Sequence, residues 1–366
     1  MAITRPEFDV AIIGGGPAGA SAAITAARYG AHVALLEAGE FPRHKVCGEF
    51  ISAESLDILR DLLRDVPDAA CILAEAPVVD KVRLLLDHAF TRAPVSPAGL
   101  SIPRYDLDHL LWQAAQLSGV CARSDCDVRS VEGNGSFKLG TSAGNIEASA
   151  VIVAAGRWSR FRPKVAVPQG PKWVGLKAHY REPASNHSTD LYFFDHGYCG
   201  VQPVSAGVVN ACAMVRSDRA TSLEEVLALA PALAERSYNW QPLTEPITTA
   251  PLIYRAPEPV RDNLMFVGDA AAFIDPFVGD GISIALRTGR LAGNELSPAI
   301  RNSIAITTAI ASYEKKYGEQ FVPLIAAASR LRPLLSWPKP AQFAVLELLR
   351  FPGLMPYLIR RTRRTH

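Results

Sequence analysis

The amino-acid sequence predicts an α/β fold: a parallel sheet assembled from separate segments, an antiparallel sheet between those segments, and helices at the C-terminus. Three observations predict it. Residues 8–36 alternate strand, helix and strand, and a second unit of strand, turn and helix begins at residue 263. Between the two units lie short apolar runs bounded by Gly, Pro or Asn, as in an antiparallel sheet. A chain of 366 residues is also long enough for about two domains.

Composition and charge exclude several classes of protein. The chain is 49% hydrophobic and 20% charged, so it is neither disordered nor a coiled coil. Its 38 basic and 36 acidic residues give a net charge of +2, and we expect no nucleic-acid partner. The six cysteines form no CxxC motif and stand at no zinc-ligand spacing, so we expect no metal site and a reducing compartment. Because no hydrophobic signal-peptide core precedes Phe8, we expect a cytoplasmic protein.

The first unit is predicted as strand 8–13, helix 20–29 and strand 31–36. The first strand is a short apolar run, typical of a strand that is buried on both faces. The helix is rich in alanine, and the sequence Gly-Gly-Gly-Pro-Ala-Gly at residues 14–19 joins it to the strand. This order is that of a dinucleotide-binding βαβ unit.

Each glycine of this unit has a predicted role. Gly14 permits the tight turn, Gly16 lets the backbone approach a pyrophosphate, and Gly19 lets the helix pack on the strand. Exposed N–H groups at the helix start then bind the anion. Glu37 lies 18 residues beyond Gly19, where a carboxylate accepts hydrogen bonds from both ribose hydroxyls and disfavours a 2′-phosphate. The ligand is therefore FAD or NAD, and its further predicted contacts here are Pro17, Ala18 and Ala38.

The second unit decides between FAD and NAD. A buried strand at 263–267 is followed by Gly268, Asp269 and the sequence Asp-Pro-Phe-Val-Gly-Asp-Gly-Ile at 275–282. This resembles the second flavin signature of the glutathione-reductase-like flavoproteins. The resemblance implies that Asp269 binds the ribityl chain and that Pro276 and the glycines lie beneath the isoalloxazine ring. Enzymes that bind only NAD do not need this second signature, so we expect FAD.

The residues of the second unit suit that role physically. Gly279 and Gly281 let the backbone approach the ring, and a helix at 282–296 directs its positive N-terminus toward the flavin. Such a helix stabilises an anionic reduced flavin. We therefore add Gly268, Gly279, Gly281 and Ile282 to the predicted FAD contacts.

Two motifs between these units agree with this prediction. Arg104 opens a helix through residue 115 and is followed four residues later by Asp108, a pattern similar to that of the flavoprotein family, in which the Arg meets the flavin or its phosphates. The alternative is a surface helix start. Gly156 follows a strand at 150–155 and resembles the Asp-Gly motif of flavin hydroxylases, but Ala155 stands in place of the Asp. We therefore assign no nicotinamide role to it by analogy.

The chain as a whole resembles the superfamily of geranylgeranyl reductases and flavin-dependent hydroxylases, related in fold to p-hydroxybenzoate hydroxylase. Residues 41–52, Phe-Pro-Arg-His-Lys-Val-Cys-Gly-Glu-Phe-Ile-Ser, carry the most telling local match. The resemblance implies that Cys47 lies near the isoalloxazine and Arg43 near the flavin or its diphosphate. The alternatives are a small buried hydrophobe for Cys47 and a solvated loop charge for Arg43.

A second segment departs from the family pattern. Geranylgeranyl reductases carry Gly-Tyr-x-Trp-x-Phe-Pro along the substrate cavity, and residues 197–203 here have Gly200 in place of the Trp and Gln202 in place of the Phe. These changes would widen the cavity wall and make it more polar, so we expect a different substrate. The paired Trp residues of flavin halogenases are missing as well.

The predicted domains follow from these assignments. The FAD-binding domain is discontinuous, comprising residues 1–75, 101–162 and 252–300. The substrate domain comprises residues 76–100 and 163–251, with strands at 78–87, 172–180, 189–195, 198–204 and 207–216 and an amphipathic helix at 222–236. Residues 301–366 form a C-terminal helical segment, in which apolar helices at 341–350 and 351–359 precede a cluster of arginines. That tail either contacts an anionic membrane surface or is a covering helix with a solvated end.

Three functions remain open. The first is a monooxygenase that transfers oxygen from a flavin C4a-hydroperoxide to a hydrophobic or aromatic small molecule. The second is a reductase or dehydrogenase of a carbon–carbon bond, with Cys47, Tyr198 or His196 as proton donor. His44 and His179 are further candidates by sequence neighbourhood alone. The third is a non-catalytic flavin-binding accessory protein. For an enzyme, NAD(P)H or a partner flavin reductase would supply the electrons.

Overall fold

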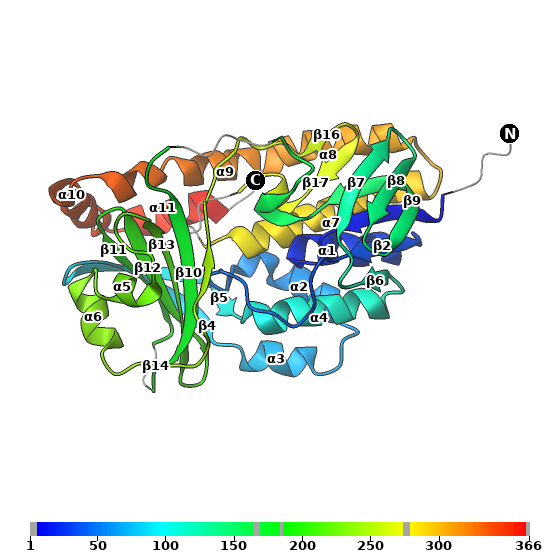
Figure 1. Cartoon of the computed structure of the whole chain (residues 1–366). Coiled ribbons are helices and arrows are strands. Elements are labelled where there is room, and N and C mark those ends of the chain that lie inside the picture. The colour runs from blue at the N-terminus through cyan, green and yellow to red at the C-terminus, as the bar shows by residue number, and fades with distance from the viewer. Residues whose placement is uncertain (1–5, 164–168, 184–185, 274–278, 364–366) are drawn as a thin grey trace, which may run out of the picture.

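The computed structural model describes residues 6–163, 169–183, 186–273 and 279–363. Two β-sheets make up the centre of the molecule, with helices around the first sheet and along one side of both (Figure 1). The predicted α/β class is confirmed.

The first sheet is built around a parallel core. Its order is β16-β17-β9-β1-β2-β6, and the pairs β17–β9, β9–β1, β1–β2 and β2–β6 are parallel. Apart from Asp9 in β1, the residues of β1 and β2 are buried and apolar, as expected for strands covered on both faces. Its strands are β1 (Phe8–Ile13), β2 (Val33–Leu36), β6 (Cys121–Arg123), β7 (Val128–Gly133), β8 (Phe137–Thr141), β9 (Gly144–Val153), β16 (Val260–Arg261) and β17 (Leu264–Phe266).

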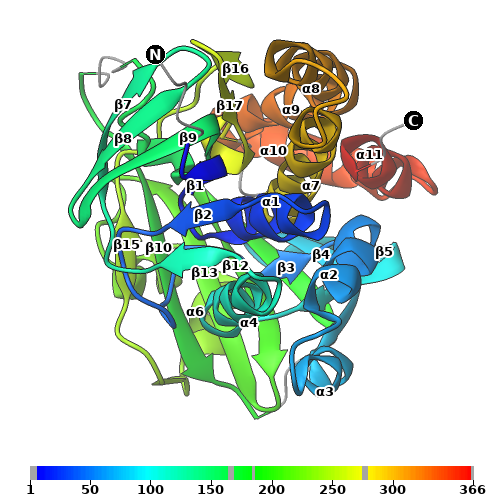
Figure 2. The same ribbon diagram turned by 90° about the vertical axis from the view of Figure 1, so that its right-hand side faces the viewer.

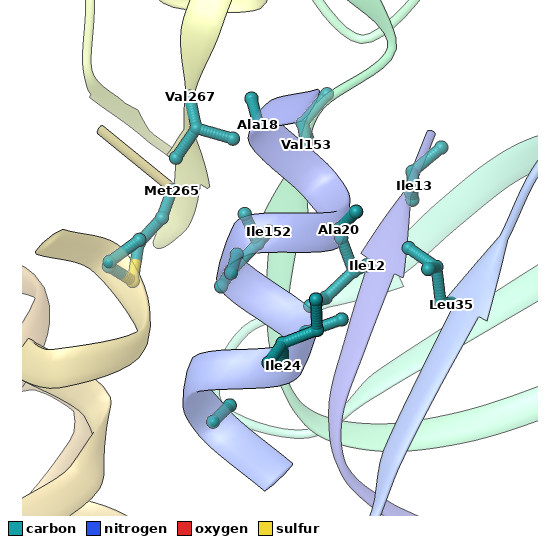
Figure 3. Packing of buried hydrophobic residues seen from close by; sticks show 14 of the residues in the cluster. Ile12, Ile13, Ala18, Ala20, Ile24, Leu35, Ile152, Val153, Met265 and Val267 are labelled. Carbon is teal, nitrogen blue, oxygen red and sulfur yellow. The ribbon is translucent and has the colours of Figure 1, made fainter. Parts of the chain in front are cut away.

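Helix α1 (Pro17–Arg28) lies between α7 (Gly281–Ile300) and α4 (Arg104–Leu117) beside this sheet (Figure 2). The contact with α7 is close because glycine stands where the helices meet. A Cβ on Gly289 would lie 2.1 Å from the Ala18 carbonyl oxygen. Toward the sheet, Ala20 and Ile24 of α1 pack on apolar side chains of three strands (Figure 3). This packing joins segments more than 200 residues apart, so α7 belongs to the same core as α1.

The second sheet has the order β14-β10-β13-β12-β11-β4-β5-β3, and its pairs are antiparallel except β11–β4. β15 pairs with β10 as well. Its strands are β3 (Phe50–Ile51), β4 (Val78–Leu86), β5 (Ala89–Ser101), β10 (Trp173–Arg181), β11 (Ser188–Phe194), β12 (Gly197–Ser205), β13 (Val208–Arg216), β14 (Gln241–Pro242) and β15 (Ile247–Thr249). The five strands predicted between the two flavin units are found, and each end lies within one residue of its predicted position.

One predicted helix is wrong. Residues 222–236 form two short helices, α5 (Leu223–Leu227) and α6 (Pro231–Ser237). Pro231 has no N–H to donate within a continuous helix, and it stands instead in the first turn of α6, where that N–H is not needed. A capping box between Ser222 and Glu225 fixes the start of α5.

The remaining helices are α2 (Leu56–Leu63), α3 (Ala69–Glu75), α8 (Ile306–Gln320), α9 (Val322–Ser329), α10 (Lys339–Leu349) and α11 (Leu354–Arg363). α8 is tied to the first sheet, because the buried Tyr313 hydroxyl donates to the Phe266 carbonyl oxygen at 2.6 Å. In the part of the chain that the structure describes, no helix is both long enough and apolar enough to cross a membrane.

Candidate functional site

A cavity of about 710 Å³ lies where the two sheets meet. Its walls come from the loop after β1, the segment after β2, the start of α4, the turns after β9 and β17, the start of α7, and the second sheet. The carboxyl ends of the central parallel strands therefore open into it, which is where ligands bind in sheets of this kind.

Most of the predicted FAD contacts line this cavity. Lining it are Gly14, Gly16, Pro17, Ala18, Glu37, Ala38, Arg43, Cys47, Arg104, Gly156, Gly268, Asp269, Gly279, Gly281 and Ile282. Gly19 lies behind the loop, and Pro276 lies outside the described residues. Their contact with FAD stays a prediction, but the fold brings them together from five separate segments.

The glycine loop has the shape of an anion site. Gly14 has φ +107°, and a Cβ there would lie 2.4 Å from the Ala154 carbonyl oxygen. A Cβ on Gly19 would lie 1.8 Å from the Gly14 carbonyl oxygen, so α1 and the loop approach as closely as predicted. A Cβ on Gly16 would meet only an Arg104 nitrogen, at 3.9 Å. Since no side chain caps α1, its first N–H groups are available to a phosphate.

The carboxylate of Glu37 accepts hydrogen bonds from the glycine loop and from its own turn. Its Oε2 accepts from the Gly15 N–H at 2.8 Å, and its Oε1 accepts from the Gly39 N–H at 3.0 Å and pairs with Arg43 Nη2 at 2.7 Å. Burial alone would raise the pKa of this carboxyl, but the hydrogen bond and charge of Arg43 and the two backbone N–H groups hold it below its usual value. Arg43 is thus a partner of Glu37 rather than a solvated loop charge.

Arg104 is largely buried and ion-paired rather than exposed at a helix start. Its Nε and Nη2 donate to the two oxygens of Asp108 at 2.7 and 2.6 Å, and the Asp108 side chain is 1% exposed. The guanidinium lies beside Gly16, at the edge of the cavity. A fixed cation at this place suits a diphosphate.

The other flavin unit faces the same cavity. Gly268 and Gly279 have φ +56° and +74°, a conformation that favours glycine. α7 begins at Gly281 without a side-chain cap, so its positive N-terminus is directed at the cavity. Burial raises the pKa of Asp269, against the opposing charges of Arg157 and Arg104.

Cys47 lies in the cavity wall with its thiol protonated. Its Sγ accepts from the Glu49 N–H at 3.3 Å, and its carbonyl oxygen accepts from the Asn210 side chain at 2.9 Å. Burial raises the pKa of this thiol above its ordinary value. Cys47 therefore faces the cavity as a hydrogen-bond donor rather than as a thiolate.

Glu49 is a site residue that the sequence prediction missed. It is fully buried, and its carboxylate pairs with Lys177 and accepts from His179 Nε2 at 2.7 Å and from the Arg104 N–H at 2.8 Å. Burial raises its pKa, but these partners more than offset that effect and leave the pKa below its usual value. The available signal was the pair Lys177 and His179, two polar residues that alternate on one face of an otherwise apolar strand.

The second sheet supplies the far wall. Tyr198, Gly200 and Gln202 of β12 line the cavity, so both departures from the reductase pattern lie at the cavity surface. Gln202 donates to Ser101 Oγ at 2.7 Å and accepts from Thr189 at 2.8 Å, which makes this part of the wall polar.

His196 is not brought to the site. It stands at the turn between β11 and β12, with φ +57° and its Nε2 3.4 Å from Asp195 Oδ1. It is absent from the described cavity lining. Its role as a proton donor stays a prediction that this position does not support, because closeness in sequence on a hairpin turn does not place a side chain on the same face as Tyr198.

Comparison with known proteins agrees with this geometry. Residues 7–318 match the family described as FAD binding domain. The menaquinone reductase of Mycolicibacterium smegmatis is 25% identical, over 96% of this chain and 90% of that protein. Digeranylgeranylglycerophospholipid reductase 1 of Methanopyrus kandleri is 26% identical, over 90% of this chain and 91% of that protein.

Solved structures show the same fold. The flavin-dependent brominase Bmp2 superposes with a TM-score of 0.79 and 20% identity, covering 97% of this chain and 93% of that one. The halogenase PltM in complex with phloroglucinol and FAD superposes with a TM-score of 0.75 and 18% identity, covering 98% of this chain and 87% of that one.

The residues present fit FAD. Gly16, the free N–H groups of α1 and Arg104 would hold the diphosphate, Glu37 the ribose, and Asp269 with the start of α7 the flavin half. The family match covers most of the chain. The first and second predicted cofactor-binding units of the chain meet at one cavity. The chain belongs to the FAD binding domain family and is an FAD-dependent oxidoreductase of the superfamily that includes geranylgeranyl reductases and flavin-dependent halogenases.

Proposed function

We propose that this oxidoreductase is a monooxygenase that inserts one oxygen atom of O2 into a hydrophobic or aromatic small molecule. The far wall of the cavity carries the proposal. Gly200 and Gln202 line it where the reductase pattern has Trp and Phe, and Gln202 makes this part of the wall polar through its hydrogen bonds with Ser101 and Thr189. Such a wall suits a substrate other than a long isoprenoid chain.

The lining residues suit such chemistry. Bound FAD, once reduced by NAD(P)H or a flavin reductase, would supply the two electrons that activate O2, with one oxygen atom entering the substrate and the other leaving as water. The N-terminus of α7 and Arg104 favour negative charge in the cavity. Apolar side chains of the second sheet exclude water around the substrate, among them Phe50, Leu191 and Met214.

A second candidate is reduction of a carbon–carbon double bond. The observation in its favour is that Cys47 and Tyr198 both line the cavity. The raised pKa of Cys47 keeps its thiol protonated, so it has a proton to donate near a reacting carbon. For either reaction we propose NAD(P)H or a partner flavin reductase as the electron source.

We also propose that the corner formed by α10 and α11 contacts an anionic membrane surface. Leu348 and Phe351 are 61% and 71% exposed there, and Tyr357 is 49% exposed. From Arg350 onward the sequence has five arginines and no acidic residue. Exposed apolar side chains beside a basic cluster are the features of interfacial binding. The buried Met355 shows that α11 also covers the protein.

Rapid mixing distinguishes the two reactions. The FAD-loaded protein is photoreduced without oxygen and then mixed with oxygenated buffer, with and without a panel of small aromatic compounds. A monooxygenase consumes O2 with a compound-dependent rate and releases less hydrogen peroxide when the compound is oxidised. If anaerobic mixing with an alkene reoxidises the flavin and O2 changes nothing, the reductase assignment is correct instead.

A further inference from the structure

Arg157 is a cavity residue with an unusual environment. It lies in the short 3-10 helix η2 (Gly156–Trp158), directly after β9, and its side chain reaches the cavity. Its Nη2 donates to Thr249 Oγ1 at 2.6 Å. Its guanidinium carbon lies 5.0 Å from the ring centroid of Phe273. The aromatic ring and a hydroxyl thus fix its position.

The other arginines that line the cavity each have a carboxylate partner. Arg43 pairs with Glu37 at 2.7 Å, and Arg104 pairs with Asp108 at 2.6 Å. Arg160, at the rim, pairs with Asp127 at 3.1 Å. Among the described residues, Arg157 has no carboxylate within ion-pair distance.

Within the described part of the chain, the charge of Arg157 is therefore uncompensated at close range. Burial lowers its pKa, and Asp269 opposes that effect from beyond ion-pair distance. A partly buried cation is costly unless an anion pairs with it. A guanidinium presents a planar fork of donors that matches a carboxylate. Its hydrogen bond to Thr249 uses one of these donors, and the described residues leave most of the fork unused.

The cavity wall beside Arg157 indicates what kind of molecule would carry the anionic group that pairs with it. Thr249 lies opposite Gly175, Gly175 opposite Met214, and Met214 opposite Tyr198 in adjacent strands. Since residues paired across strands point to the same side, this row runs from Arg157 along the cavity wall to the Tyr198 ring. An apolar or aromatic body would lie along Met214 and Tyr198 with its acid group at Arg157.

We propose that Arg157 binds a carboxylate of the substrate, which makes the substrate class an aromatic or similarly compact apolar carboxylic acid. This proposal names the substrate class of the proposed function. It rests on that function in one respect only, namely that the substrate binds in this cavity. The residues fitted to the FAD diphosphate lie elsewhere in the cavity, at Gly16 and Arg104.

The test is binding of benzoate to the FAD-loaded protein, followed by the change in the visible flavin spectrum. Benzamide, which has nearly the same shape and no charge, is the matched ligand. Arg157→Gln removes the cation, and Arg157→Lys keeps the charge without the fork. Arg181→Gln is the matched control, because Arg181 is an exposed arginine at the end of β10, away from the cavity lining.

We expect benzoate to bind at least tenfold more tightly than benzamide. Arg157→Gln should remove this preference while FAD content stays the same, Arg157→Lys should reduce it, and Arg181→Gln should leave it unchanged. Equal binding of the two ligands, or a preference that survives Arg157→Gln, overturns the proposal. Loss of FAD in both Arg157 variants overturns it too, since Arg157 would then hold the cofactor. The assay involves no O2, so failure of oxygen transfer leaves its result intact.

Discussion

Replacing Glu49 with Gln tests the buried charge cluster that joins the two sheets. Glu49 is fully buried and Lys177 is 1% exposed, so the substitution leaves an ammonium group without its counter-charge inside the protein. Removing one partner of a buried ion pair costs about 3–5 kcal/mol. Because the Gln amide oxygen still accepts a hydrogen bond, we expect the lower part of that range.

The predicted change is large enough to measure by thermal unfolding. With an unfolding entropy of about 2.1 cal/mol/K per residue, a loss of 3–5 kcal/mol lowers the Tm of a chain of 366 residues by roughly 4–6 °C. The assay is circular dichroism of the FAD-saturated protein at pH 7. Asp57→Asn is the control, because Asp57 and Arg60 form an exposed pair at 3.0 Å whose loss should not change the Tm measurably.

Two further measurements separate the lost charge from a general defect. The double variant Glu49→Gln with Lys177→Met removes both charges, and we expect it to recover most of the lost stability. The pKa of Glu49 is lowered in the folded protein, so its contribution is present above its usual pKa of 4.5 and is lost as the pH falls through the lowered value. The difference between wild type and Glu49→Gln should therefore shrink below pH 4.5. A Tm within the error of wild type at pH 7 refutes the reasoning.

Three other substitutions or treatments give separate tests. Gly19→Ala places a methyl group 1.8 Å from a carbonyl oxygen of the phosphate loop and should abolish FAD retention on gel filtration, whereas Gly318→Ala, where nothing lies within 4 Å, should retain FAD fully. Burial raises the pKa of Cys47, so alkylation of its thiol by iodoacetamide should be slow at pH 8 and accelerate above pH 9. Peptide mass spectrometry measures the labelling, and rapid labelling at pH 7 would contradict the described site. Leu348→Ser with Phe351→Ser should reduce sedimentation with phosphatidylglycerol vesicles severalfold, and wild-type protein should ignore phosphatidylcholine vesicles; sedimentation unchanged by the substitutions would exclude this surface as the contact.

Local patterns predicted much of the fold because neighbouring residues determine them. The strand at Phe8–Ile13, the glycine loop after it and the alanine-rich α1 are specified by apolar runs and by the conformations open to glycine. The break at Pro231 was missed because the apolar spacing continues through it. A proline inside such a spacing needs to be given more weight than the spacing itself.

Contacts between distant residues could not be predicted in the same way. Glu49 meets Lys177 and His179 across 128 and 130 residues of sequence, so the cluster exists only once β10 lies beside the segment that carries Glu49. His196 lies outside the cavity lining for a related reason: the direction of a side chain in a hairpin turn depends on the backbone conformation of the turn. For the same reason, the motif at Gly156 could be recognised in the sequence, but not the finding that Arg157, the next residue, has no carboxylate within ion-pair distance among the described residues.

Oxygen transfer is tested most directly with isotopically labelled O2. The FAD-loaded protein, reduced by light, is exposed to the labelled gas together with compact aromatic carboxylic acids, and the products are analysed by mass spectrometry. We predict a product that contains one labelled oxygen atom and whose formation is lost in Arg157→Gln. Recovery of every acid unchanged, with all reducing equivalents released as labelled hydrogen peroxide, would contradict the account.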